Sequence, residues 1–469
     1  MILALSARLG LGQASVSQTV IVSGVAARPR LRPCRCRVNR MALLPAPRAL
    51  RALGRDGWLL FVARSARMLA YGSLAVVLVL YLQSAGMSGD RVGRLLTFTL
   101  LGDTAISLWL TTRADRWGRR RTLVVGAALM ALAGIAFIAT SDFVVLLAAA
   151  TIGVISPSGN EVGPFLSIEQ AALSQTLTDS ERTEVFAWYN LAGSVATAVG
   201  ALAGGWLCHV AEINGATGAA VYRPVIIGYG GIGVLLAAMF CFLSPATEIV
   251  TAENTSRSGT FLGLHRSRSL VVMLAALFAL DAFGGGFILQ SLIAAWFHTR
   301  FHVDPALLGT IFFCANLLAA ASALSAAALA KRFGLLNTMV FTHLPSNVLL
   351  ILVPLMPNLP LAIGVLLVRF SISQMDVPTR QSYTMAVVHP DERSAAAGIT
   401  AVARSIGASL SPYLAMLLLA QQATLSMPFF LAGGIKIAYD LWLLWAFARV
   451  EPPNIDSRRA NQPTSSSTG

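Results

Sequence analysis

Long apolar runs constrain the fold of this chain more than any other feature. A helix needs about 20 apolar residues to cross the roughly 30 Å of hydrocarbon in a bilayer. Hydrophobic residues make up 56% of the 469 residues and charged residues only 12%, whereas soluble domains carry about 25% charged residues. We therefore expect an all-α integral membrane protein in contact with lipid. The apolar runs predict twelve membrane-spanning helices, at residues 58–82, 91–112, 121–140, 142–168, 184–210, 222–244, 270–297, 306–330, 335–357, 359–388, 394–420 and 426–448.

The arginines predict how these helices are oriented. They concentrate in every second connection, as expected when positive charge is retained on the cytoplasmic side of a membrane. Both termini are then cytoplasmic, and the plasma membrane or a bacterial inner membrane is the expected location. The longest polar gap divides the chain into two sets of six helices. The expected domains are an N-terminal bundle (56–244), a cytoplasmic linker (245–269), a C-terminal bundle (270–449) and a disordered tail (450–469).

Residues 1–55 form a basic N-terminal extension with no acidic residue. Residues 1–40 have two explanations, an organelle transit peptide or a start of translation at Met41, and we favour the second. The net charge of +14 does not predict a nucleic-acid partner, because the arginines lie at the ends of apolar segments. The five cysteines have no spacing typical of zinc or disulfide sites, so no metal is expected.

A weak internal repeat relates the two halves. "ADRWGRRRT" at 114–122 aligns with "AKRFGLLNT" at 330–338, and "DSERT" at 179–183 aligns with "PDERS" at 390–394. The two offsets, 216 and 211 residues, are nearly equal, and the matches occur in the same order. This indicates a duplicated six-helix unit, an organisation found in many transporters.

The segment "TTRADRWGRRR" resembles the loop motif GxxxDRxGRR of the major facilitator superfamily, although Thr111 replaces its first glycine. The resemblance covers about residues 56–450. It implies two pseudo-symmetric six-helix bundles around a central cavity, and a cytoplasmic latch that joins the halves. A carboxylate such as Asp115 can dock at a helix N-terminus, and the arginines can pair with acids on the fourth span. The gate and motif residues are then Asp115, Arg116, Gly118, Arg119, Arg120, Glu161, Glu169, Arg332, Gly334, Asp376 and Arg380.

The fifth span carries "GALAGG", which is similar to the GPxxGG signature of exporters in that superfamily. Ala201 replaces the proline, and Pro412 stands at the matching place in the eleventh span. Gly200, Gly204, Gly205 and Pro412 are therefore helix-packing candidates. A close helix crossing explains these residues as well as an antiport hinge does.

Charges inside the spans are costly and therefore need a role. Asp103 and Asp281 lie near the middle of their spans and are candidates for proton coupling, because burial disfavours a charged carboxylate. The alternative is a helix–helix hydrogen bond or an ion pair with Arg67 or Arg404. Three glycines after Asp281 should loosen that helix. The candidates for the substrate cavity are Arg67, Tyr71, Asn190, Gln290, Asn316 and Arg404, the two arginines as ligands of an anionic substrate.

Two further pairs have a spacing of four residues, which brings side chains together on a helix. Lys436 and Asp440 are expected to neutralise each other. Asp376 and Arg380 are expected toward the cytoplasmic end of the tenth span, as gate residues.

The best functional prediction is a monomeric secondary transporter that exports a drug or metabolite in exchange for protons. Uptake by proton symport or uniport is an alternative, and a non-transporting receptor-like or lipid-handling relative is another. The sequence has no GxxxxGK[ST] loop, so the proton gradient is the expected energy source and no cofactor is expected. It also has no HExxH or GxSxG motif, and an enzyme is not expected.

Overall fold

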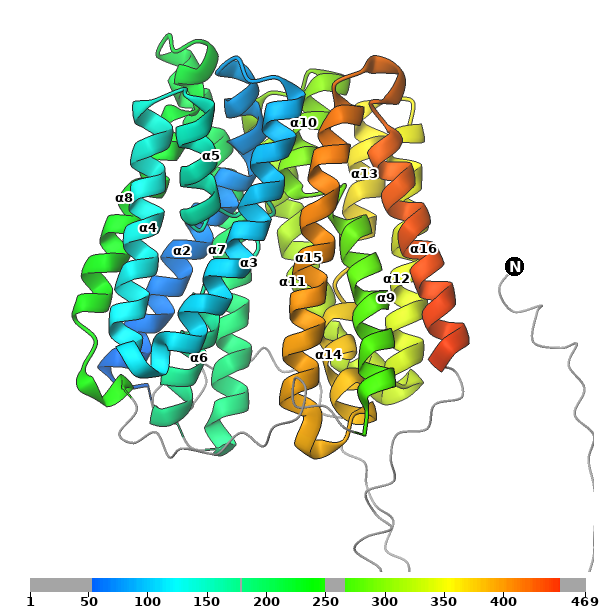
Figure 1. Ribbon diagram of the computed structural model, residues 1–469. Coiled ribbons are helices and arrows are strands. Elements are labelled where there is room, and N and C mark those ends of the chain that lie inside the picture. The colour runs from blue at the N-terminus through cyan, green and yellow to red at the C-terminus, as the bar shows by residue number, and fades with distance from the viewer. Residues whose placement is uncertain (1–52, 178, 249–265, 448–469) are drawn as a thin grey trace, which may run out of the picture. The chain divides into compact units, whose positions relative to one another are not determined.

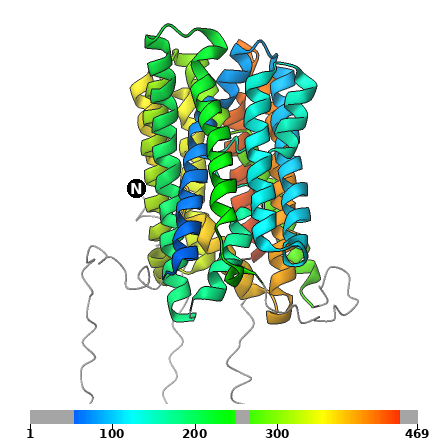
Figure 2. The same cartoon turned by 90° about the vertical axis from the view of Figure 1, so that its left-hand side faces the viewer.

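The computed structural model describes residues 53–177, 179–248 and 266–447, and every regular element in these ranges is a helix. Figure 1 shows the helices in two bundles, and Figure 2 shows them running roughly parallel to one another. The all-α fold predicted from the apolar runs is confirmed. The basic extension, most of the linker and the tail lie outside the described residues.

The N-terminal bundle comprises the first six spans. Its elements are α2 (Arg55–Ser84), α3 (Gly89–Trp117), α4 (Arg119–Ala139), α5 (Phe143–Ile152), α6 (Phe165–Thr176), α7 (Asp179–Ile213), η1 (Gly218–Tyr222), α8 (Arg223–Cys241) and η2 (Pro245–Thr247). The core of this bundle is apolar and contains α2 at its centre, with 83% of its most apolar window buried.

The C-terminal bundle comprises the other six. Its elements are α9 (Arg268–Gly286), α10 (Gln290–Phe301), α11 (Pro305–Phe333), α12 (Leu335–Leu352), η4 (Val353–Leu355), α13 (Leu359–Phe370), α14 (Asp376–Val387), η5 (Pro390–Glu392), α15 (Arg393–Leu419), η6 (Gln422–Thr424) and α16 (Met427–Phe447).

Within the described residues, ten helical segments are long and apolar enough to cross a membrane, and α5 and α13 are shorter apolar helices. Each short helix is followed, after a non-helical segment, by a second short helix: α5 by α6, and α13 by α14. If each broken pair counts as one crossing, the chain has the twelve spans that its sequence predicts. The fourth span is longer than predicted, because α6 extends beyond residue 168 to Thr176.

Three spans, the fourth, the seventh and the tenth, are interrupted near their middles. The seventh breaks between α9 and α10, where α9 ends at Gly286, as the run of three glycines predicts. The fourth breaks at 153–164, a segment that contains Pro157 and Pro164 and three glycines. Gly163 has a φ of +80°, and a Cβ there would lie 2.4 Å from Val154 Cγ1. Glycine is required at this position, since other residues rarely adopt such a φ and have no room here.

The two loops of the internal repeat have the same conformation. Gly118 separates α3 from α4 with a φ of +97°, and Gly334 separates α11 from α12 with a φ of +84°. The matched glycines therefore make equivalent turns between the second and third spans of each half.

The halves meet at the side opposite the linker, which we call the far side. Figure 1 shows the two bundles close together there, and spread apart on the linker side, where α6 and α14 lie. On the far side Tyr413 donates from its hydroxyl to Asp90 (3.1 Å) and from its backbone N–H to Thr97 (3.2 Å). The backbone N–H of Ser291 donates to Pro157 O (3.2 Å).

Candidate functional site

A cavity of about 540 Å³ lies between the two halves, in the size range of sites for small ligands. Residues from both bundles and from all three interrupted spans line it. Of the side chains that the sequence analysis assigned to the cavity, Gln290, Asn316 and Arg404 lie in its wall. Gln290 and Asn316 are joined by a hydrogen bond of 3.3 Å.

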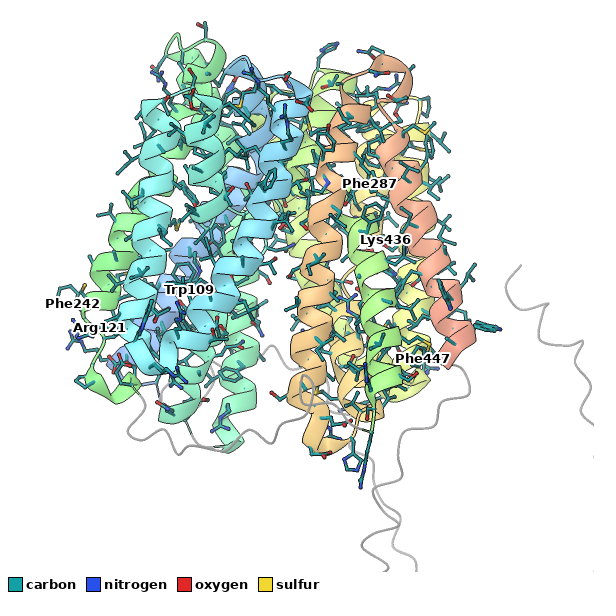
Figure 3. All side chains as sticks on the ribbon, viewed as in Figure 1. Trp109, Arg121, Phe242, Phe287, Lys436 and Phe447 are labelled. Carbon is teal, nitrogen blue, oxygen red and sulfur yellow. The ribbon has the colours of Figure 1, made fainter. Side chains whose placement is uncertain are left out.

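Asp281 on α9 is the centre of a cluster of charges in the C-terminal half. Lys436 Nζ lies 2.5 Å from one carboxylate oxygen, and Arg380 Nη1 lies 3.1 Å from the other. His343 Nε2 is 3.7 Å away. Figure 3 shows Lys436 within the C-terminal bundle. Asp281 was predicted to be near the middle of its span, but the partners considered from the sequence, Arg67 and Arg404, do not bind it.

The pairing predicted between Lys436 and Asp440 is wrong. Lys436 extends to Asp281, and Asp440 instead contacts His343 Nδ1 (2.8 Å) and accepts from Asn347 Nδ2 (3.0 Å), both on α12. The physical reason is that a buried carboxylate needs more hydrogen-bond donors than one neighbouring turn supplies, and the packing of α12 against α16 provides them. His343 was missed by the sequence analysis, although a titratable residue inside an apolar span is a signal of function.

Asp376 and Arg380 pair as their spacing predicts, at 3.1 Å, but their place in the molecule differs from the prediction. Both line the central cavity, at the start of α14 just after the break in the tenth span. A continuous helix was assumed for this span. The break at 371–375 divides it instead, so Asp376 begins a new helix beside Asp281 rather than lying at the cytoplasmic end.

A second cluster of charges lies in the N-terminal half. Arg67 is fully buried, and its guanidinium binds Glu161 (2.8 Å) and Glu169 (2.7 Å). Tyr189 donates to Glu169, and Arg64 lies 3.5 Å from Glu161 and 4.4 Å from the centre of the Tyr189 ring. Two cations and two carboxylates therefore balance each other here.

This N-terminal cluster corrects several predictions. Glu161 and Glu169 bind arginines of α2 rather than those of the loop at 113–121, because the break in the fourth span directs them toward the bundle interior. Arg67 and Tyr71 are fully buried in the bundle and do not line the cavity. Asn190 is exposed and does not line the cavity either.

The two clusters occupy related positions in the repeat. Arg67 and Asp281 are on the first span of each half, and Glu169 and Arg380 are separated by 211 residues, which is the offset between "DSERT" and "PDERS". Each half therefore joins its first and fourth spans with an ion pair. The cation is on the first span in the N-terminal half and on the fourth span in the C-terminal half. The N-terminal pair is sealed in the bundle, whereas both members of the C-terminal pair line the cavity.

Asp103 forms a hydrogen bond between helices, the alternative considered for it. Its carboxylate accepts from the backbone N–H of Gly163 (2.6 Å) and from Ser107 Oγ (3.3 Å). Asp103 thereby holds the break of the fourth span against α3, and it is absent from the cavity wall.

At the loop between α3 and α4, a carboxylate docks on a helix N-terminus, but it comes from Glu248. The backbone N–H groups of Arg119 and Arg120 donate to it at 2.7 and 3.1 Å. The side chain of Asp115 lies outside the described part of the structure. Arg116 and Arg332 are exposed, as is Arg121, which Figure 3 shows at the outer side of the N-terminal bundle. A latch between the halves at this loop stays a prediction.

The small residues of the fifth span lie at close helix crossings. A Cβ on Gly200 would lie 2.1 Å from Leu69 O, and one on Gly204 would lie 2.8 Å from Ser73. Gly205 faces α11, where a Cβ would lie 2.3 Å from Pro305 O. Pro412 is buried inside α15.

Comparisons with known proteins agree with this architecture. The family model of the Major Facilitator Superfamily matches residues 60–412 and 278–468. An uncharacterized membrane protein of Saccharomyces cerevisiae is 30% identical over 426 residues, which cover 85% of this chain and 95% of the yeast protein.

Solved structures of transporters share the fold. A mutant of the nucleoside transporter NupG superposes with a TM-score of 0.68 at 13% identity, covering 83% of this chain and 99% of that one. A D-xylose-proton symporter gives 0.62 at 12% identity (84% and 97%), and the human organic anion transporter MFSD10 gives 0.55 at 17% identity (85% and 100%). With the two repeated bundles, the motif loop and these matches, the chain belongs to the major facilitator superfamily.

Proposed function

We propose that this protein is a secondary transporter that moves a small polar solute by alternating access and couples the movement to protons. The observation that carries the proposal is the central cavity, which lies between two halves in contact on the far side and is lined by buried ion pairs. Rocking of the halves would expose this cavity to one side of the membrane at a time. With both termini and the linker in the cytoplasm, as the arginines predict, this conformation faces inward.

Asp281 is the carboxylate best placed to couple protons to this motion. It joins three spans, because its partners Lys436 and Arg380 are on α16 and α14. A proton on Asp281 would remove the charge that holds both cations, and would release α9 from the two neighbouring helices. Asp103 has no cationic partner of this kind and fixes a backbone break instead.

The test reconstitutes the protein in proteoliposomes and measures solute flux with and without a pH gradient. The solutes to screen are nucleosides, sugars and organic anions, the classes that appear in the names of the structural relatives. We expect Asp281→Asn to abolish accumulation driven by the pH gradient while solute exchange without a gradient continues.

Asp103→Asn is the matched control, because it is the same substitution in the other half. It should leave coupling intact, although thermal stability should fall, because asparagine accepts a weaker hydrogen bond from the backbone N–H of Gly163 than the carboxylate does. Wild-type flux that ignores the pH gradient would contradict proton coupling and leave uniport. No flux of any solute under any gradient would favour a receptor-like or lipid-handling protein.

Export in exchange for protons is the direction that we propose from the "GALAGG" segment. Oriented vesicles distinguish it from uptake. A proton antiporter accumulates solute inside the vesicle when protons flow out of the vesicle down their gradient, whereas a proton symporter accumulates it when protons flow in.

A further inference from the structure

The C-terminal half contains more permanent positive charge than its carboxylates neutralise. Asp281 is bound by Lys436 and Arg380, and Arg380 also binds Asp376. Asp440 contacts His343 Nδ1 and accepts a hydrogen bond from Asn347 Nδ2, both on α12. The cavity wall in this half has two carboxylates, Asp281 and Asp376, among the described residues. Its four permanent cations are Arg369, Arg380, Arg404 and Lys436.

Two of these cations have no carboxylate partner among the described residues. Arg369 is only 8% exposed, and its Nε has no hydrogen-bond acceptor in the residues that the structure describes. Arg404 on α15 is half-buried, lines the same cavity and makes no ion pair or hydrogen bond within the described ranges. A buried charge without a partner is costly, and such groups in membrane proteins mark the positions of ligands.

Buried side-chain atoms of the cavity wall, charged and uncharged, also offer hydrogen-bond donors. The buried side-chain atoms of the wall without a hydrogen-bond partner in the described part of the chain are Arg64 Nε and Nη1, Gln290 Nε2, Ser346 Oγ, Arg369 Nε and Ser373 Oγ. The nitrogens among them can only donate hydrogen bonds, whereas the two hydroxyls can both donate and accept them. A ligand that satisfies these atoms must be rich in hydrogen-bond acceptors.

The N-terminal half does not compete for a negative charge. The two arginines of its buried cluster, Arg64 and Arg67, are balanced by Glu161 and Glu169. The free positive charge of the cavity is therefore confined to the C-terminal half.

We propose that the cavity binds a small organic anion with one acidic group, a carboxylate or a phosphate ester, held by Arg369 and Arg404. The planar guanidinium groups of arginine suit both acids, since each can donate two parallel hydrogen bonds. The oxygen-rich body of the ligand accepts hydrogen bonds from Gln290, Ser346 and Ser373. This inference rests on the proposed function, because it assigns the substrate class of the same cavity.

The test measures the thermal stability of the purified full-length protein in detergent at constant ionic strength. The anionic probes are gluconate and glycerol 3-phosphate, which separate carboxylate from phosphate recognition, and their neutral counterparts are glucose and glycerol. A ligand that binds only the folded state raises Tm, and we expect at least one anion to raise it by several degrees while the neutral probes do not.

Arg404→Gln and Arg369→Gln should each weaken the apparent affinity for the anion at least about tenfold, the loss of one charged hydrogen-bonding partner. Without a probe, Arg404→Gln should keep or raise Tm, because it removes an unpaired charge. Arg404→Lys, which retains the charge, should keep part of the affinity and serves if the glutamine variant is unstable. Arg300→Gln, at an exposed arginine of α10, is the matched control and should bind like wild type.

The proposal is overturned if neither anion stabilises the protein more than its neutral counterpart, or if the stabilisation survives in both glutamine variants. Failure of the proposed function has a different signature. A protein that binds gluconate or glycerol phosphate but never moves it across a membrane would disprove transport and leave the anion site in place.

Discussion

Arg67 is enclosed by two glutamates in the middle of the N-terminal bundle, out of contact with the cavity. A buried ion pair adds little net stability compared with a well-packed apolar pair, but the removal of one partner leaves an uncompensated charge, which costs about 3–5 kcal/mol. Arg67 is therefore expected to contribute to the stability of the bundle, since it lies outside the cavity wall.

We predict that Arg67→Gln lowers the stability of the protein by about 3–5 kcal/mol, because Glu169 then loses its cation and only Arg64 remains to balance two buried carboxylates. Thermal unfolding in detergent measures the loss. The double variant Arg67→Met with Glu169→Leu should be less damaged than the single one, since it removes both charges. Arg113→Gln, an exposed arginine that stacks on Trp109, is the control and should leave Tm unchanged. An unchanged Tm in Arg67→Gln would contradict a structural role for this cluster.

At the scale of elements, α7 approaches α2 on one face and α11 on another, and glycines make both approaches possible. Gly200 and Gly204 face α2, while Gly205 faces Gly309 of α11, across the boundary between the halves. Helices that meet through glycines can pack backbone against backbone, which compensates for the absence of a hydrophobic driving force within lipid.

Gly200→Ala tests this packing. A methyl group there would lie 2.1 Å from Leu69 O, so α2 and α7 must separate, at a cost of about 1–3 kcal/mol. Gly231→Ala in α8 is the matched control, because a Cβ there has no atom within 4 Å. It should be neutral or stabilising by up to about 1 kcal/mol, since alanine is the better helix former. Equal Tm values for the two variants would show that the crossing is not tight.

At the scale of the whole molecule, the contacts between α3 and α15 close the far side. A Cβ built on Gly89 lies 3.2 Å from Ala420 Cβ, close to the roughly 3.5–4.5 Å that a disulfide requires. These positions belong to different halves, and alternating access requires them to separate.

We therefore predict that Gly89→Cys with Ala420→Cys, after the five native cysteines are replaced by alanine, forms a disulfide that locks the far side. A third cysteine at Ala323, in the cavity wall, reports access. In the locked protein it should react with a water-soluble maleimide from the linker side but not from the far side, and reduction should restore access from both. Each single cysteine variant should behave like the unlocked protein. Continued labelling from the far side in the locked protein would contradict closure at this contact.

The sequence alone determined the fold class, the twelve spans, the duplication and the titratable residues within the membrane. Apolar length and arginine distribution are one-dimensional properties, and a bilayer imposes the same rule on every segment, so these features can be predicted without a structure. It also identified Asp281, Arg404, Gln290 and Asn316 as residues of interest, because a polar group inside an apolar span stands out wherever it packs.

Only the tertiary structure decided which of these groups meet. The pairing of Lys436 with Asp281, of Asp440 with His343 and of Arg67 with Glu161 depends on which helices face one another and on where the fourth and tenth spans break. A helix presents its side chains around a full circle, and neighbours three or four residues apart compete with partners on other helices that the sequence does not place. The division of charge into a balanced N-terminal cluster and a C-terminal surplus at the cavity follows from that packing.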